Sequence, residues 1–244
     1  MHTPGGLRVA KPGAGPNLYT PTLPMATALR LELSATHPQP RLLEQAVAVL
    51  RAGGVVVYPT DTVYAVGCDI QQKKAVERVA RLKGIAPEKA NFSCICPDVS
   101  IVADYATGIT TPLYKLLKAA LPGPYTFVVK ASKTIPRHFQ SAKKTVGLRV
   151  PDHPIPRELA RRLGNPILTT SLTNPEDPVL GYLSDPHQIY QLYARQVDAV
   201  LDAGFGGLVP STVIDISGGE GAVLVLREGL GPLEPLNLVF EPES

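Results

Sequence analysis

The stretch GGVVVYPTDTVYAVGCD, residues Gly53 to Asp69, decides how the chain is organised. Residues 55–58 form an apolar run typical of a strand that is buried on both faces. Pro59 ends this run, and four side chains with a hydroxyl or carboxyl group follow: Thr60, Asp61, Thr62 and Tyr64. Because proline fixes φ and short polar side chains lose little entropy when they are ordered, this turn is preorganised. We expect a polar site where a core strand ends.

Strand and helix patterns alternate on both sides of this stretch. Alternating or continuous apolar runs predict strands at 29–34, 55–58, 92–96, 125–131, 145–150, 167–172 and 197–202. Apolar residues spaced three and four apart predict helices at 41–54, 73–84, 99–106, 112–121, 155–164 and 186–196, with Asp98 as the cap of the third. The last two strands, 211–217 and 222–228, are joined by GGEG, which indicates a hairpin. The expected fold is α/β, a single domain with a twisted mixed sheet of parallel and antiparallel strands flanked by helices.

The amino-acid composition limits the classes of protein to which this chain can belong. The chain has 244 residues, of which 44% are hydrophobic, enough for the core of one domain. Its net charge of +3 permits a polyanionic ligand without requiring one. The three cysteines suggest reduced thiols in a cytoplasmic protein, and Cys94 and Cys96 have no second Cys/His pair nearby, so no metal site is expected. Apolar runs are too short to span a membrane.

The first 25 residues differ from the rest of the chain. They are rich in proline and glycine and show no periodicity. We therefore expect a disordered leader at 1–25 and one folded domain at 26–244. Met25 is an alternative start of translation.

Several other predicted strands begin or end with similar polar side chains. These are Thr126, Arg149, Ser171, Thr173, Ser211 and Arg227. Ligands of α/β sheets bind where strands end, but each hydroxyl also fits a turn, and each arginine also fits an ion pair. His153 is interpreted as a turn residue rather than a base. Because no Ser-His-Asp order, Walker loop or Rossmann fingerprint is present, no catalytic residue is assigned.

Seven motifs in a fixed order resemble the YrdC-like family. They are YPTDTVYAVG, KG, LPGPYTFVVK, GLRVPDHP, TTS, PSTVID and LREG, and the resemblance covers residues 41–235. The wording of KGIAPEKANFSCIC and TTSLTNPED is most similar to the YciO-type subgroup. This resemblance implies a YrdC-like fold and a nucleotidyltransferase that makes threonylcarbamoyl-AMP, or a related adenylate, from threonine, bicarbonate and ATP for tRNA modification.

The resemblance also implies roles for particular residues. The threonine substrate is expected at Thr60, Tyr64, Thr126 and Ser211. The nucleotide is expected at Lys83, Lys89, Arg149, Ser171, Thr173 and Arg227. Fixed cations offset the repulsion between a carbamate and the α-phosphate, and Mg²⁺ is expected to be held mainly by phosphates.

Three departures from the family's pattern leave a second function open. The usual Lys-x-Arg is Lys83-Gly84-Ile85 here, with Lys89 as a substitute cation, and the usual Ser-x-Asn ends in Thr173. The histidine usual on the next strand has no counterpart in residues 93–96. The alternative is a YciO-type module that binds tRNA or double-stranded RNA without making the adenylate. Since aromatic residues are only 6% and tryptophan is missing, stacking of single-stranded RNA is poorly supported.

Overall fold

One mixed sheet organises the whole domain. The computed structural model describes residues 27–86, 92–139, 144–174, 181–218 and 222–236. Its strands are β1 (Leu29–Glu32), β2 (Val56–Tyr58), β3 (Ala65–Asp69), β4 (Ser93–Ile95), β5 (Ala106–Thr107), β6 (Tyr125–Ala131), β7 (Thr145–Arg149), β8 (Ile167–Ser171), β9 (Ala199–Asp202), β10 (Thr212–Asp215) and β11 (Leu224–Arg227). They are ordered β1-β9-β2-β3-β8-β4-β7-β6-β10-β11, and β5 pairs with β6. Parallel pairs such as β1 with β9 and antiparallel pairs such as β3 with β8 confirm a mixed sheet.

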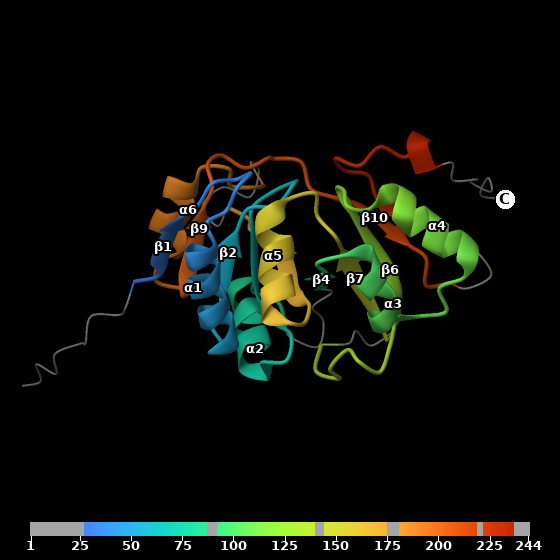
Figure 1. Cartoon of the computed structure of the whole chain (residues 1–244), viewed down its shortest axis with the longest axis horizontal. Helices are drawn as coiled ribbons and strands as arrows, with labels where there is room; N and C mark the ends of the chain where they lie inside the picture. Colours follow the sequence, from blue (N-terminus) through green and yellow to red (C-terminus); the bar gives the residue numbers. More distant parts are fainter. Residues whose placement is uncertain (1–26, 87–91, 140–143, 175–180, 219–221, 237–244) are drawn as a thin grey trace, which may run out of the picture.

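Helices cover both faces of this sheet. They are α1 (Pro40–Arg51), α2 (Lys73–Leu82), α3 (Val102–Tyr105), α4 (Thr111–Ala120), α5 (Pro154–Leu163) and α6 (Pro186–Tyr193), with short 3₁₀ turns η2 (Val99–Ile101) and η3 (Glu234–Leu236). Helices α1 and α5 lie side by side, and α4 lies at the other end of the molecule with β6 and β10 (Figure 1). The α/β fold with flanking helices is confirmed.

Alternating side chains divide the core into two clusters. Val56 and Tyr58 of β2 pack with α1 and α5, whereas Val57 packs with the larger cluster that includes α2, α4 and α6. Because successive strand residues point to opposite faces, the two clusters lie on opposite faces of the sheet. The described residues of β6, β7 and β10 contribute to the larger cluster but not to the one under α1 and α5. On these strands, the α1/α5 face is therefore open to polar side chains.

Most predicted elements are present, with two corrections. The buried strand after Gly54, the Asp98 cap and the β10–β11 hairpin pairing are confirmed. Strand β3, which pairs antiparallel with β2, was not predicted. The helix predicted at 99–106 was wrong in its form, because it is a 3₁₀ turn followed by one short helix, and Ala106 already belongs to β5.

Two further predictions concern membrane-spanning segments and the leader at residues 1–25. Within the described ranges, no helix is long and apolar enough to cross a membrane. The predicted leader lies outside the described residues.

Candidate active site

The polar turn in the opening stretch joins β2 to β3 and is held together by its own hydroxyls. Thr60 Oγ1 donates to the carbonyl of Val63 at 2.7 Å and accepts the backbone N–H of Thr62 at 3.1 Å. It also lies 3.0 Å from Thr62 Oγ1. Thr60 and Thr62 are both buried. A side chain that bonds to its own turn in this way fixes the backbone, so the hydroxyls occupy defined positions.

A buried ion pair attaches this turn to β7. Arg149 Nη2 donates to Asp61 Oδ1 at 2.9 Å and to Thr62 Oγ1 at 3.1 Å, and both charged side chains are only 8% exposed. The second Asp61 oxygen accepts the backbone N–H of Asp152 at 3.0 Å. Burial lowers the pKa of Arg149, and the negative charge of Asp61 opposes that shift. The Nε of Arg149 is buried and has no hydrogen-bond partner among the described residues.

The register of the sheet brings the two predicted arginines into one row. Arg149 pairs with Ile95, and on the far side of β6 Thr126 pairs with Val213, which in turn pairs with Arg227. Phe127 pairs with Leu148 where β6 and β7 run antiparallel, so the same register places Thr126 opposite Arg149. Residues in one row point to the same face, which here is the face that α1 and α5 leave open.

Ser211 links Thr126 to Arg227 at this face. The hydroxyls of Thr126 and Ser211 are 2.8 Å apart, and both residues are buried. Arg227 donates to the carbonyl of Ser211 through Nη2 at 2.8 Å and through Nε at 3.2 Å. The positive charge of Arg227 adds to the effect of burial in lowering the pKa of Arg149. Five of the predicted residues thus form one group: Thr60, Thr126, Arg149, Ser211 and Arg227.

Three other predicted residues form a second group at the end of β8. Lys83 follows α2, and its Nζ donates to the carbonyl of Ser171 at 3.1 Å and to Thr173 Oγ1 at 3.0 Å. Burial lowers the pKa of Lys83. Ile167 pairs with Ile95, which lies in the same row as Arg149, and Ser171 follows Ile167 by four residues. Ser171 is therefore about 13 Å along β8 from that row. Ser171 thus lies away from the row of Arg149 along the strand, whereas Thr60 follows Tyr58, whose partner Ala65 pairs with Ser171.

Two predicted residues are not placed in either group. The side chain of Tyr64 is fully buried, and its hydroxyl donates to the carbonyl of Gly204 at 2.8 Å and accepts the N–H of Ala203 at 3.3 Å. Burial raises its pKa to about 12. The phenol thus anchors the chain that follows β9. Lys89 lies outside the described residues.

The remaining sequence features also have defined positions. His153 caps α5, with Nδ1 accepting the N–H of Ile155 at 3.2 Å, as expected for a turn residue. Ile85 is 39% exposed. Cys94 and Cys96 are buried, and among the described residues no three His, Cys, Asp or Glu side chains are grouped to hold a metal ion.

Sequence reasoning did not assign two residues that shape the site. Asp61 was part of the polar turn but had no role, because its partner Arg149 is 88 residues away. Gly147 lies between Ser93 and Thr126, and a Cβ at this position would collide with Ser93 Oγ. The sequence signal that could have identified Gly147 is a glycine in the middle of a strand, between Thr145 and Arg149.

Comparison with known proteins agrees with the fold and the motifs. The profile of the Sua5/YciO/YrdC family, described as "Telomere recombination", matches residues 48–229. The uncharacterized protein YciO of Escherichia coli (strain K12) is 41% identical over 200 residues, which are 82% of this chain and 94% of that protein. A threonylcarbamoyl-AMP synthase of Halorhodospira halophila is 32% identical over 186 residues, 76% of this chain and 95% of the synthase.

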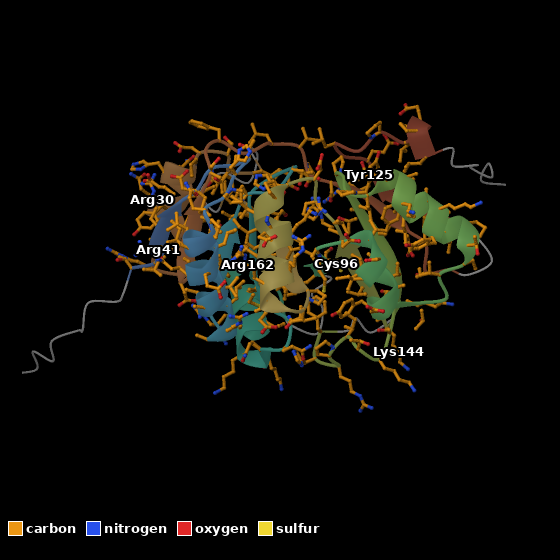
Figure 2. The ribbon with its side chains drawn as sticks, in the orientation of Figure 1. Arg30, Arg41, Cys96, Tyr125, Lys144 and Arg162 are labelled. Carbon is orange, nitrogen blue, oxygen red and sulfur yellow. The ribbon has the colours of Figure 1, made fainter. Side chains whose placement is uncertain are left out.

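Solved structures give the same result. The crystal structure of E. coli YciO superposes with a TM-score of 0.78 at 38% identity, covering 86% of this chain and 99% of that one. The crystal structure of P. abyssi Sua5 complexed with L-threonine superposes with a TM-score of 0.75 at 27% identity, covering 85% of this chain and 59% of Sua5. Figure 2 shows Cys96 and Tyr125 to the right of the yellow helix α5, on the side where β6 and β7 lie in Figure 1.

Proposed function

Because this chain belongs to the Sua5/YciO/YrdC family, we propose that it is a nucleotidyltransferase that makes threonylcarbamoyl-AMP, or a closely related adenylate, from threonine, bicarbonate and ATP. The observation that carries this proposal is the group formed by the hydroxyls of Thr60, Thr126 and Ser211 with two arginines, Arg149 and Arg227. P. abyssi Sua5, which has the same fold, was crystallised in complex with L-threonine, and synthases are among the relatives of this chain.

Within the larger group, the hydroxyls and Arg149 suit the amino acid, whereas Arg227 would contact a phosphate. The hydroxyls of Thr60, Thr126 and Ser211 are short, rigid donors and acceptors for its polar atoms. The Nε of Arg149 is buried without a hydrogen-bond partner among the described residues. It would donate a hydrogen bond to a carboxylate or carbamate oxygen of the substrate. Tyr64 would support this site through the chain after β9 rather than touch the substrate.

The second group suits the nucleotide. Lys83 would contact phosphate oxygens, and the stretch of about 13 Å along β8 between Ser171 and the row of Arg149 leaves room for the α-phosphate. In the reaction a carbamate oxygen attacks the α-phosphorus, an O–P bond forms, and the P–O bond to pyrophosphate breaks. Arg149, Arg227 and Lys83 would offset the charge that gathers on these oxygens. An Mg²⁺ that enters with ATP would be held mainly by its phosphates.

The product would serve the modification of tRNA in the cytoplasm. A carbamoyl adenylate is a mixed anhydride, so a second enzyme must transfer its acyl group to an acceptor, which in this family is an adenosine next to the anticodon. The formation of the adenylate, as proposed, involves no covalent intermediate on the protein.

A second candidate function is RNA binding without synthesis, on tRNA or double-stranded RNA. The observation that favours it is the 39% exposure of Ile85, at the position where the resemblance implies the arginine of the Lys-x-Arg motif. A phosphate-binding site with one cation fewer would turn over more slowly, whereas binding of a structured RNA by charge and shape would tolerate the change.

One experiment separates the two functions. Purified protein is incubated with ATP, Mg²⁺, bicarbonate and each amino acid in turn, and pyrophosphate and new adenylates are measured. Threonine-dependent pyrophosphate release that falls at least about tenfold in Thr126→Val supports synthesis, because one hydrogen bond that orients the substrate is lost. Thr107→Val, at an exposed position on β5, is the matched control and should change nothing. No adenylate with any amino acid, together with salt-dependent tRNA binding, would favour the RNA-binding function.

A further inference from the structure

The ammonium of Lys83 is held by two acceptors before any ligand arrives. It donates to the carbonyl of Ser171 and to Thr173 Oγ1, and its side chain is partly buried between α2 and the end of β8. An ammonium has three N–H donors, so two of them are used within the protein and one remains for a ligand. A free lysine side chain loses rotamer entropy when it is fixed, and here much of that cost is met during folding.

Thr173 is itself fixed from the opposite side. Its carbonyl accepts the hydroxyl of Tyr193 at 2.7 Å, and its backbone forms an isolated antiparallel bridge with Tyr182. The next residue, Asn174, donates its backbone N–H to Gly181 at 3.2 Å. Tyr193 belongs to α6 and is only 4% exposed, so it connects Thr173 to the larger core cluster. Thr173 is therefore held in a fixed position, which suits a residue that supports Lys83 better than one that moves to contact a ligand.

We infer that Thr173 is a positioning residue, whose hydroxyl directs the Lys83 ammonium toward a nucleotide phosphate while Tyr193 holds Thr173 in place. The inference rests on the proposed function for the identity of the ligand, although the hold on Lys83 is independent of it. The resemblance described above implies asparagine at this position, in the family's Ser-x-Asn motif. Threonine offers a shorter side chain with a single oxygen, which accepts from the ammonium without presenting amide hydrogens to it.

The test uses two substitutions that differ in one group. Thr173→Val keeps the shape but removes the hydroxyl, and Thr173→Ser keeps the hydroxyl. Loss of a hydrogen bond to a charged group should weaken ATP binding about five- to thirtyfold in Thr173→Val, measured by calorimetry, and Thr173→Ser should stay within about twofold of the wild type. Thr107→Val is the control for a threonine-to-valine change elsewhere, and the melting temperature of each variant is measured alongside.

A second readout needs no ligand. The Cε signal of ¹³C-labelled Lys83 is titrated by NMR between about pH 7.5 and 10.5. The two acceptors favour the charged ammonium, so removing one should lower the pKa of Lys83 further in Thr173→Val but not in Thr173→Ser. Tyr193 is the titratable neighbour that holds Thr173, and burial raises the pKa of its phenol. If Thr173→Val does not fold, Thr173→Ala and Tyr193→Phe replace it.

The outcomes separate this inference from the proposed function. An unchanged Lys83 titration in Thr173→Val, or a loss in Thr173→Ser as large as in the valine variant, overturns the role of the hydroxyl. A wild-type protein that binds no ATP overturns the proposed ligand, and the Lys83 titration then decides separately whether Thr173 holds the ammonium. Weaker ATP binding with a lowered Lys83 pKa in the valine variant alone supports both.

Discussion

Arg149 is a charged side chain in the protein interior, and the turn after β2 provides most of its partners. Asp61 and Thr62 accept its Nη2 hydrogen, and Asp61 also binds the N–H of Asp152. Burying an ion pair contributes little by itself, but leaving one partner behind is costly. The pair therefore fixes the position of the turn relative to β7 more than it adds to stability.

Asp61→Asn should consequently destabilise the protein. Arg149 would remain buried without a counter-charge, and the free energy of unfolding should fall by about 3–5 kcal/mol in denaturant titration. Asp152→Asn is the matched control, because only the backbone N–H of Asp152 takes part in the contact and its side chain is exposed. Equal stability of the two variants would show that the ion pair has no such role.

Arg227→Ala should weaken ATP binding without unfolding the protein. Arg227 is exposed at the end of β11, so little packing is lost, but a charge-assisted hydrogen bond to phosphate contributes about 1.5–3 kcal/mol. Calorimetry with ATP measures the change, and Arg51→Ala on α1 is the control for loss of an exposed arginine elsewhere. Unchanged affinity in Arg227→Ala would remove this residue from the nucleotide site, and Arg227 would then serve only to hold Ser211.

Ile85→Arg should speed up adenylate formation if the chain is a synthase with one cation fewer. The sequence left open that Ile85 packs against the strand at 92–96, where an arginine would be destabilising. Because Ile85 is 39% exposed, a guanidinium at this position can stay hydrated and the fold should tolerate it. One added cation near the phosphates could lower the barrier by roughly 1–3 kcal/mol, about five- to a hundredfold in rate.

Turnover and melting temperature are measured together on this variant. Leu29→Arg, at an exposed position on β1, is the control for the same kind of change far from Lys83. A stable Ile85→Arg protein with no gain in rate would count against synthesis and favour the RNA-binding function.

At the scale of single elements, the start of α5 depends on a titratable cap. His153 accepts the N–H of Ile155 through Nδ1, which requires the neutral ring. Burial lowers the pKa of His153, with Asp61 and Asp152 opposing the shift. A base whose pKa is lowered on folding stabilises the protein above its unfolded pKa, near 6.5, and loses that contribution as the pH falls through this value toward the folded pKa.

The stability of the wild type should therefore decrease between about pH 7.5 and pH 5. His153→Asn keeps a capping acceptor that does not titrate, so this part of the pH dependence should become flatter. Urea unfolding at a series of pH values measures the difference between the two proteins. Parallel pH profiles for wild type and variant would show that the cap does not titrate in this range.

At the scale of the whole molecule, the domain has a core cluster on each face of one sheet, and the polar site includes residues of β6 and β7, strands that take no part in the cluster under α1 and α5. Figure 1 shows α1 and α5 together in one part of the molecule and β6 and β10 at its other end. The elements that form this core begin at β1, Leu29–Glu32. Residues 1–25 have the composition of a chain that cannot bury enough apolar surface to fold.

A shortened chain that starts at Met25 should thus melt at the same temperature as the full chain. Differential scanning calorimetry of both proteins at equal concentration makes the comparison. A drop of more than about 4 °C, which corresponds to roughly 1–2 kcal/mol for a domain of this size, would mean that the leader packs on the domain.

The sequence by itself determined the alternation of strands and helices, because apolar periodicity and glycine or proline boundaries are local signals that need no knowledge of distant residues. It also indicated the polar turn after β2, since proline and short hydroxyl side chains restrict the backbone within a few positions. It did not reveal β3, because residues 65–69 are buried on both faces and show no alternation that would separate them from the turn before them.

Only the tertiary structure decided which polar side chains meet. Asp61 and Arg149 are 88 residues apart, and Lys83 and Thr173 are 90 residues apart. The register of β6, β7, β10 and β11 sets the row that contains Thr126 and Arg227. The same packing directed the hydroxyl of Tyr64 to the chain after β9. Contacts across a sheet depend on strand order and register, which arise from the burial of the whole core and leave no local trace in the sequence.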